Sequence, residues 1–212
     1  MTTADGTIRL LMELRSQGVS DMAVLKALEQ TPRDGFVSAD QAERAWENTA
    51  LPIGCGQTIS QPIVVGLMTQ KLDLGERMRV LEVGTGSGYQ AAILARLVRR
   101  VYTVERHADL LREAHARFES LKLHNITTRR GDGSRGWPEQ APFDRIMVTA
   151  AAETMPEALI EQLAPGGIMV VPVGTDTWDQ KLYRVERTED GYDSVPFLDV
   201  RFVPLVVESR SA

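Results

Sequence analysis

The chain has 212 residues, of which 43% are apolar and 25% are charged, and its formal net charge at pH 7 is −5. These values are ordinary for a globular protein with one substantial core, and the excess of acidic residues argues against a surface that binds nucleic acid or an anionic membrane. The sequence contains no apolar run of the roughly 18 residues that a membrane span needs. Its N-terminal stretch carries acids at helical spacing and does not resemble a signal peptide. A single cysteine, Cys55, and three scattered histidines offer neither a disulfide framework nor a metal-ligand cluster. We therefore expect a cytoplasmic protein of enzyme size that needs no metal.

The first fifty residues are expected to be mainly helical. Apolar residues recur at three- and four-residue spacings over 8–14 and 21–30, and Asp21 stands where a helix cap is needed. A charge-free, turn-rich loop, 51–62, follows this helical part. Another helix is expected over 62–72, because a proline suits the first helical turn and the apolar period continues after it.

Strands and helices alternate after residue 76. Segments rich in Val, Ile and Thr predict strands over 79–83, 100–105, 125–132, 143–150 and 166–174. Helical patterns lie between them, over 89–98, 107–122 and 153–163. The last part holds two more strand candidates, 180–188 and 195–207, which are expected to add antiparallel strands to one edge. This order predicts a doubly wound α/β fold with a mostly parallel sheet, in one domain over 1–212. Its parts are a helical segment 1–50, the loop 51–62, an α/β core 76–174 and C-terminal strands 175–212.

A glycine-rich loop joins the first of these strands to its helix. Gly84, Gly86 and Gly88 permit a tight turn in which backbone N–H groups approach a ligand closely. The dinucleotide fingerprint needs its third glycine five positions after the first, and Tyr89 occupies that position. The spacing therefore disfavours a nicotinamide dinucleotide.

Two acidic residues narrow the choice of ligand. Glu105 ends the second strand, where a carboxylate can accept hydrogen bonds from both hydroxyls of a ribose. Glu82 precedes the glycine loop, where it is unfavourable to phosphate and favourable to an amine or a cation. A nucleoside that carries an amino group and a sulfonium, S-adenosylmethionine, fits this combination. The alternative is a strand–helix turn that binds no ligand.

Asp132 and Gly133 follow the third strand of the core. Asp132 could accept a hydrogen bond from an adenine amino group, while Gly133 leaves room for the ring. A Gly-Asp-Gly sequence is also a common turn. Its place at the carboxyl edge of the sheet favours a ligand site, because ligands of open α/β sheets bind there.

The chain resembles the bacterial form of the protein-L-isoaspartate O-methyltransferase family from about Thr31 to Val206. In this family Trp46 and Asn48 often have Tyr and Asp as counterparts, and the first thirty residues match only as a helical pattern. The loop GQTISQP is the most family-specific motif. The similarity lies in AWENTALPIGCGQTISQP, VLEVGTGSGYQAAILA, VYTVER, HNITTRRGDG, APFDRIMVTAAAETMPEALIEQLAPGGIMVVPVG and VRFVPLV.

The resemblance implies a seven-stranded class I methyltransferase fold and an enzyme that uses S-adenosylmethionine. It would methylate the carboxylate of L-isoaspartyl and D-aspartyl residues in damaged proteins and peptides, after which the ester re-forms a succinimide that partly hydrolyses to normal aspartate. The family assigns the catalytic role to Ser60, and Thr58, Ile59 and Ser60 would line the boundary between substrate and cofactor. Its C-terminal region, 200–206, lies near the substrate in the family, although the pattern alone predicts a buried strand.

The uncharged loop suits this chemistry. A carboxylate is already ionised at pH 7, so it needs no general base, and a fixed positive charge against it would weaken it as a nucleophile. Neutral donors such as the Ser60 hydroxyl can hold it without that cost. The alternative for Ser60 is an N-cap of the helix that starts near Pro62. Two alternatives for the whole chain are methylation of another acceptor and a cofactor-binding module without catalysis.

Overall fold

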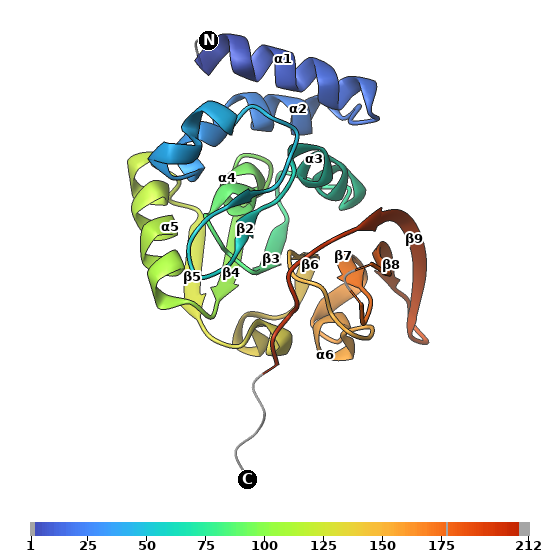
Figure 1. Cartoon of the computed structure of the whole chain (residues 1–212). Helices are drawn as coiled ribbons and strands as arrows, with labels where there is room; N and C mark the ends of the chain where they lie inside the picture. The colour runs from blue at the N-terminus through green and yellow to red at the C-terminus, as the bar shows by residue number, and fades with distance from the viewer. Residues whose placement is uncertain (1–2, 177, 208–212) are drawn as a thin grey trace.

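The computed structural model describes residues 3–176 and 178–207, and it contains one large sheet within them. Its strands lie in the order β5-β4-β3-β6-β7-β8-β9, with β5 and β9 at the edges (Figure 1). Neighbours from β5 to β7 pair in parallel, and β8 and β9 pair antiparallel. The expected doubly wound sheet with an antiparallel addition is confirmed. The bounds are β3 Arg79–Val83, β4 Arg100–Glu105, β5 Ile126–Arg130, β6 Phe143–Val148, β7 Leu163–Val173, β8 Gln180–Arg187 and β9 Tyr192–Val200.

The helices pack around this sheet and supply its covering layers. Asp21 caps α2 as expected, because its carboxylate accepts hydrogen bonds from the N–H groups of Ala23 at 2.8 Å and Val24 at 3.2 Å. None of the helices in the described ranges is long and apolar enough to cross a bilayer. The α-helices are α1 Thr3–Ser16, α2 Met22–Glu29, α3 Pro62–Lys71, α4 Tyr89–Ala95, α5 Ala108–Ser120 and α6 Glu157–Ile160. Short 3₁₀ turns are η1 Arg33–Phe36, η2 Ala39–Arg44, η3 Gly133–Arg135 and η4 Pro138–Gln140.

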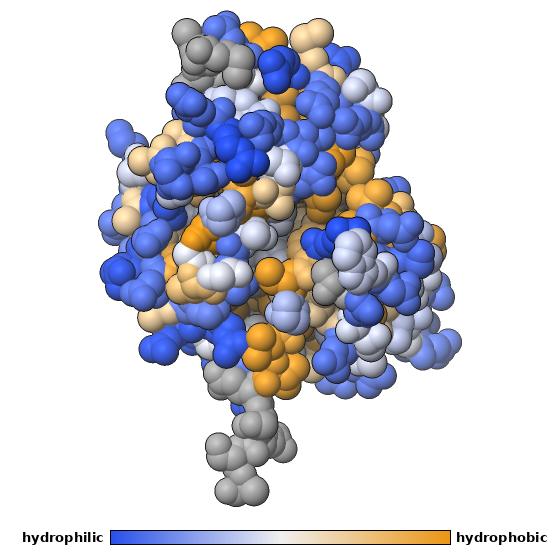
Figure 2. Space-filling view, in the orientation of Figure 1, coloured by the Kyte–Doolittle hydropathy of each residue, from blue (hydrophilic) through white to orange (hydrophobic). Residues whose placement is uncertain are grey.

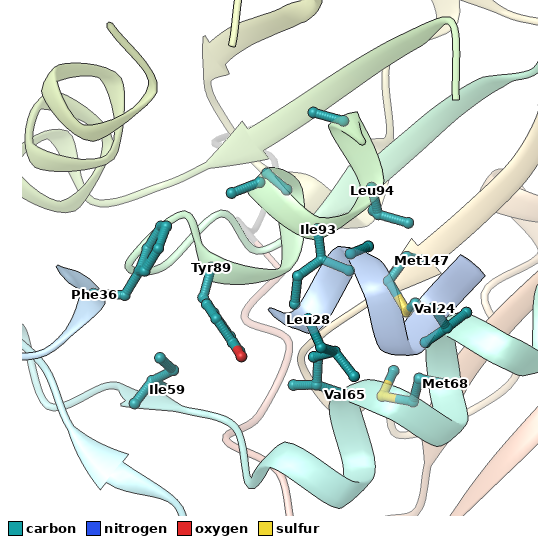
Figure 3. Close-up of a cluster of buried hydrophobic side chains, with 14 of the residues drawn as sticks. Val24, Leu28, Phe36, Ile59, Val65, Met68, Tyr89, Ile93, Leu94 and Met147 are labelled. Carbon is teal, nitrogen blue, oxygen red and sulfur yellow. The ribbon is translucent and has the colours of Figure 1, made fainter. Parts of the chain in front are cut away.

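The central strands are buried on both faces, which is why their sequences are almost continuously apolar. Alternate residues of β3 enter different cores: Val80 packs with the N-terminal helices, whereas Leu81 packs with β6 and α6. Figure 3 shows part of the first core, where Leu28 of α2, Val65 of α3 and Ile93 of α4 lie close together. The central strands are therefore covered on both faces, and their ends are the part that can face a ligand.

Two elements differ from the sequence-based expectation. Helix α6 has four residues instead of the eleven of 153–163. Pro156 stands at its N-cap, and the chain enters β7 at Leu163, so little length is left for a helix. The last strand ends at Val200 instead of continuing to 207.

The end of β9 has a clear physical cause. The side chain of Gln180 bonds both backbone groups of Phe202, accepting from its N–H at 2.6 Å and donating to its carbonyl at 3.3 Å. Beyond this point, Pro204 has no N–H to continue a ladder. The segment instead crosses to the end of β6, where Ala151 donates to Val203 at 2.8 Å and accepts from Leu205 at 2.7 Å. The prediction of a buried strand over 201–207 was wrong.

Candidate functional site

A cleft opens at the carboxyl ends of β3, β4 and β6. It is open to solvent on one side, and its empty space, about 860 Å³, includes solvent at that opening. Figure 2 shows the surface hollowed near the centre of this face, with apolar groups around the hollow. Five segments contribute to the lining: 57–60, 83–87, 104–107, 149–150 and 203–206.

The glycine loop forms the floor of the cleft. Gly84 and Gly86 both have positive φ, at 95° and 53°, so other residues would be strained there. The Thr149 hydroxyl donates to the Gly84 carbonyl at 2.7 Å, and a Cβ on Gly84 would lie 2.3 Å from that hydroxyl oxygen. The prediction that Gly84 and Gly86 lie at a ligand site agrees with their place in the lining.

Glu105 lies at the end of β4 and lines the cleft, where a ribose acceptor was expected. Its Oε2 accepts from the Gly86 N–H and its Oε1 from the His107 N–H, each at 2.9 Å. A carboxylate has about four acceptor positions, so each oxygen retains capacity for a ligand hydroxyl. Glu105 therefore fixes the glycine loop and still has capacity for the two ribose hydroxyls.

Glu82 does not line the cleft, although the sequence suggested that it would meet an amine. Its side chain is fully buried, and its Oε2 accepts a 2.5 Å hydrogen bond from the Thr103 hydroxyl. Thr103 in turn bonds the Thr85 hydroxyl at 2.6 Å, beneath the glycine loop. Burial raises the pKa of Glu82 to about 8, and the negative charge of Glu105 adds to this effect. Because Glu82 lies outside the lining, its direct contact with an amine stays a prediction, and in this structure Glu82 supports the glycine loop through Thr103 and Thr85.

Gly88 also lies outside the lining. Its φ is 88°, and a Cβ there would approach the Phe118 ring to 2.7 Å and the Ala114 side chain to 3.1 Å. Both neighbours belong to α5. Gly88 thus permits the close packing of α4 on α5, and its contact with a cofactor stays a prediction.

Asp132 and Gly133, which were predicted to act together, differ in their position relative to the cleft. Gly133 lines the cleft, and a Cβ there would lie 2.6 Å from the Val83 side chain, so the absence of one leaves this wall open. Asp132 does not line it. Its carboxylate caps η3 by accepting from the Ser134 N–H at 2.9 Å and hydroxyl at 2.6 Å. The turn role of Asp132 is present, and a contact with adenine stays a prediction.

The charge-free loop forms a small hairpin over the glycine loop. Strands β1 Leu51–Pro52 and β2 Thr58–Ile59 pair antiparallel, and the Ile53 N–H donates to the Gln57 carbonyl at 2.9 Å to close the turn. Ile53 lies against the glycine loop, since a Cβ on Gly86 would be 3.5 Å from its Cδ1. The hairpin therefore forms the roof of the cleft, with Thr58 and Ile59 in its lining.

Ser60 follows the hairpin and lines the cleft as expected. Its hydroxyl makes no hydrogen bond within residues 3–176 and 178–207. The N-cap of α3 is Gln61, which makes no side-chain capping bond. The alternative of Ser60 as a helix cap is therefore wrong, and its hydroxyl is available to a ligand.

Several lining residues were not predicted. Tyr89 is buried in the cleft wall, with its ring centroid 5.2 Å from that of Phe36. Its hydroxyl end points between Ile59 and Val65 (Figure 3). Its position directly after the glycine motif was the available signal. His107, at the N-cap of α5, also lines the cleft.

Comparisons with known proteins agree with this geometry. The family model "Protein-L-isoaspartate(D-aspartate) O-methyltransferase (PCMT)" matches residues 6–210. Curated proteins called protein-L-isoaspartate O-methyltransferase share 66% identity in Paramagnetospirillum magneticum, covering 94% of each chain, and 62% in Rhodospirillum rubrum, covering 97% of this chain and 95% of the relative.

Two solved structures of similar proteins cover most of the chain. A protein-L-isoaspartate O-methyltransferase superposes with a TM-score of 0.83 at 29% identity, over 93% of this chain and 65% of that one. A Plasmodium falciparum protein described as a β-aspartate methyltransferase, in complex with S-adenosyl-L-homocysteine, gives a TM-score of 0.82 at 27% identity, over 93% and 97%.

Proposed function

The chain belongs to the protein-L-isoaspartate(D-aspartate) O-methyltransferase family, and we infer from this membership and its cleft that it repairs isoaspartyl damage by methyl transfer. It transfers a methyl group from S-adenosylmethionine to the carboxylate of L-isoaspartyl and D-aspartyl residues in proteins and peptides. The ester then re-forms a succinimide, part of which hydrolyses to normal aspartate. The observation that carries this inference is that the Ser60 hydroxyl lies in the same cleft as the glycine loop and makes no hydrogen bond to the described part of the chain.

The residues of the cleft floor fit S-adenosylmethionine, whose sulfonium supplies the methyl group. Glu105 would accept from the ribose hydroxyls, and the backbone at Gly84 and Gly86 would meet the amino acid part. Gly133 would leave space for the adenine, with Asp132 beside it as a candidate acceptor. Glu82 would act indirectly, by holding Thr103 and Thr85 beneath the loop.

The roof of the cleft would hold the acceptor. The substrate carboxylate is ionised at neutral pH, so no residue has to remove a proton. Thr58, Ile59 and Ser60 would fix its position with neutral groups and exclude water from it. Aligning two reactants in this way can contribute roughly 7–11 kcal/mol to a reaction. We therefore propose that the main role of these residues is to position the substrate carboxylate next to the methyl group.

A methyl-acceptor assay tests the function directly. A peptide with one isoaspartyl residue and the same peptide with normal aspartate are incubated with labelled S-adenosylmethionine. The isoaspartyl peptide should be methylated and its twin should not, since the added backbone methylene moves the carboxylate, and misplaced polar contacts can give discrimination of about 10⁴. Equal labelling of both peptides would instead indicate a general carboxyl methyltransferase, and label in neither would indicate another acceptor.

We also propose damaged cellular proteins as partners and the cytoplasm as the setting. The single cysteine and the acidic net charge support a protein without disulfides that does not rely on nucleic acid. The assay above can be repeated on aged cytosolic protein extracts, whose isoaspartyl content should decline when the enzyme and its cofactor are added.

A further inference from the structure

Arg33, in the turn η1, is a fully buried arginine behind the roof of the cleft. Its Nη1 donates to the carbonyls of Ala45 at 3.0 Å and Glu47 at 3.3 Å. Its Nη2 donates to the carbonyls of Thr49 at 2.8 Å and Ser60 at 3.1 Å. Within the residues that the structure describes, the guanidinium forms no ion pair with a carboxylate.

This arrangement is unfavourable unless the guanidinium does something that an apolar residue cannot do. Removing a charge from water costs several kcal/mol by general estimates. Burial lowers the pKa of Arg33 to about 10, which still leaves it charged at neutral pH. Only arginine presents five N–H donors in a rigid planar fork, and this geometry lets one side chain hold several carbonyls at once.

The carbonyls that Arg33 holds come from two separate segments. Three belong to the turn 45–49, and the fourth belongs to Ser60. The same two segments are joined again by side chains, since Gln61 donates to the Asn48 carbonyl at 2.8 Å and Asn48 accepts from the Ile63 N–H at 3.0 Å. The backbone at Ser60 and directly after it is therefore fixed to the turn 45–49.

We propose that Arg33 is a positioning residue for methyl transfer: its guanidinium holds the Ser60 carbonyl against the turn 45–49 and so directs the Ser60 hydroxyl into the cleft. The inference rests on the proposed function and names a residue through which it operates. The hydroxyl makes no hydrogen bond within the described chain, so the position from which it projects depends on the backbone of Ser60, and Arg33 holds that backbone at its carbonyl.

The placement also explains how a cation can serve this reaction. A guanidinium placed directly against the substrate carboxylate would pair with it and reduce its nucleophilicity. Arg33 instead directs its donors to backbone carbonyls, one of which belongs to Ser60, and it does not line the cleft. The substrate would meet the neutral hydroxyl, while the charge supports that hydroxyl from behind.

Arg33→Lys tests the proposal, because lysine keeps the charge and loses the fork. Arg145 offers a matched control: it is also buried and donates to backbone carbonyls, at 2.5 Å to Leu72 and 3.0 Å to Asp73, but it does not line or support the cleft. Both variants, Arg33→Lys and Arg145→Lys, are compared with the wild type. Turnover is expressed per S-adenosylhomocysteine-binding site, titrated by calorimetry, so that unfolded molecules are not counted.

We expect Arg33→Lys to lower kcat by about 10- to 100-fold, since a misplacement near 1 Å can cost about 10²-fold. Its KM for S-adenosylmethionine and its Kd for S-adenosylhomocysteine should stay within about twofold, because the cofactor floor is built from other residues. Arg145→Lys should lower the melting temperature by about as much as Arg33→Lys does, while its kcat per binding site stays at the wild-type value. An unchanged kcat in Arg33→Lys, or an equal loss of kcat in Arg145→Lys, would overturn the proposal.

Two further measurements are needed, one in case Arg33→Lys does not fold and one to test the proposed function in the same series. If Arg33→Lys yields no folded protein, the test uses Asn48→Ala, which weakens the same link between the turn 45–49 and the segment after Ser60 at a partly exposed position. A lower kcat with unchanged cofactor affinity supports the proposal, and a wild-type kcat overturns it. The wild type is assayed on isoaspartyl and aspartyl peptides in the same series. A wild type without isoaspartyl-dependent transfer overturns the proposed function and this inference with it, whereas an active wild type with a fully active Arg33→Lys overturns only the inference.

Discussion

Replacing Glu82 with glutamine should change how the stability of the protein depends on pH. The carboxyl is fully buried, and its pKa is raised to about 8 from an ordinary 4.5, mainly by burial. Below pH 4.5 it is protonated in both the folded and the unfolded state. Between 4.5 and about 8 only the unfolded state releases the proton, so the folded state loses stability as pH rises through this window. Above about 8 both states are ionised, and the loss levels off.

The size of the effect follows from the two pKa values. They lie about 3.5 pH units apart, and each unit corresponds to roughly 1.4 kcal/mol, so the full loss is on the order of 5 kcal/mol. Glutamine cannot ionise and should escape this loss. At pH 5 the substitution should cost little, because an amide oxygen can still accept from the Thr103 hydroxyl, which lies 2.5 Å from Glu82 Oε2.

Urea unfolding of both proteins at pH 5, 6, 7 and 8 measures the effect. The free energy of unfolding of Glu82→Gln, minus that of the wild type, should rise with pH by up to about 1.4 kcal/mol per unit. The exposed Glu189→Gln serves as a control for loss of a carboxylate and should show no such rise. A flat difference from pH 5 to 8 would show that folding does not raise the pKa of Glu82.

Two predictions concern the cleft itself. Ser60→Ala should lower turnover by about 10- to 100-fold with little change in melting temperature, because the lost hydroxyl bonds nothing in the described chain and would donate to a charged acceptor. Ser120→Ala, which removes a hydroxyl bonded to a helix carbonyl, is the control. A fully active Ser60→Ala would exclude the hydroxyl from the reaction. Glu105→Ala should weaken S-adenosylhomocysteine binding at least tenfold in calorimetry, since it removes the ribose acceptor and releases the Gly86 N–H, and wild-type affinity in this variant would remove Glu105 from the cofactor site.

Local patterns were sufficient for the parts of the fold that local physics controls. The strands 79–83 and 100–105 were predicted with the bounds that the structure shows, because central parallel strands buried on both faces need continuous apolar sequence. The Asp21 cap depends on N–H groups only two and three residues away. By contrast, β9 ends where it does because of Gln180, which lies 22 residues from Phe202 and gives no sign of that contact in sequence.

The site shows the same limit. Glu82 and Glu105 are the same residue type at neighbouring strand ends, yet only Glu105 reaches the cleft. In the register of the sheet Glu82 pairs with Thr103, two residues before Glu105, so Glu82 stops short of the strand end and stays within the layer between sheet and helices. The sequence gives the order of these residues along the chain but not the register between the two strands, which decides whether each carboxylate reaches the edge of the sheet. Arg33 was missed for a similar reason, because its partners lie 12 to 27 residues away and are backbone carbonyls, which any sequence supplies.

The burial of Glu82 and Arg33 affects how the cleft can carry out methyl transfer. Methyl transfer from a sulfonium to a carboxylate neutralises two opposite charges, so the cleft must keep other charges from pairing with either reactant. Glu105 and Arg106 line the cleft itself. Behind its walls, the buried Glu82 is mostly protonated at neutral pH, and the buried Arg33 directs Nη1 and Nη2 to backbone carbonyls. The groups that remain on the roof are the neutral Thr58, Ile59 and Ser60. A buried charge can therefore stabilise the geometry of this site without weakening its nucleophile, provided that it acts through the backbone.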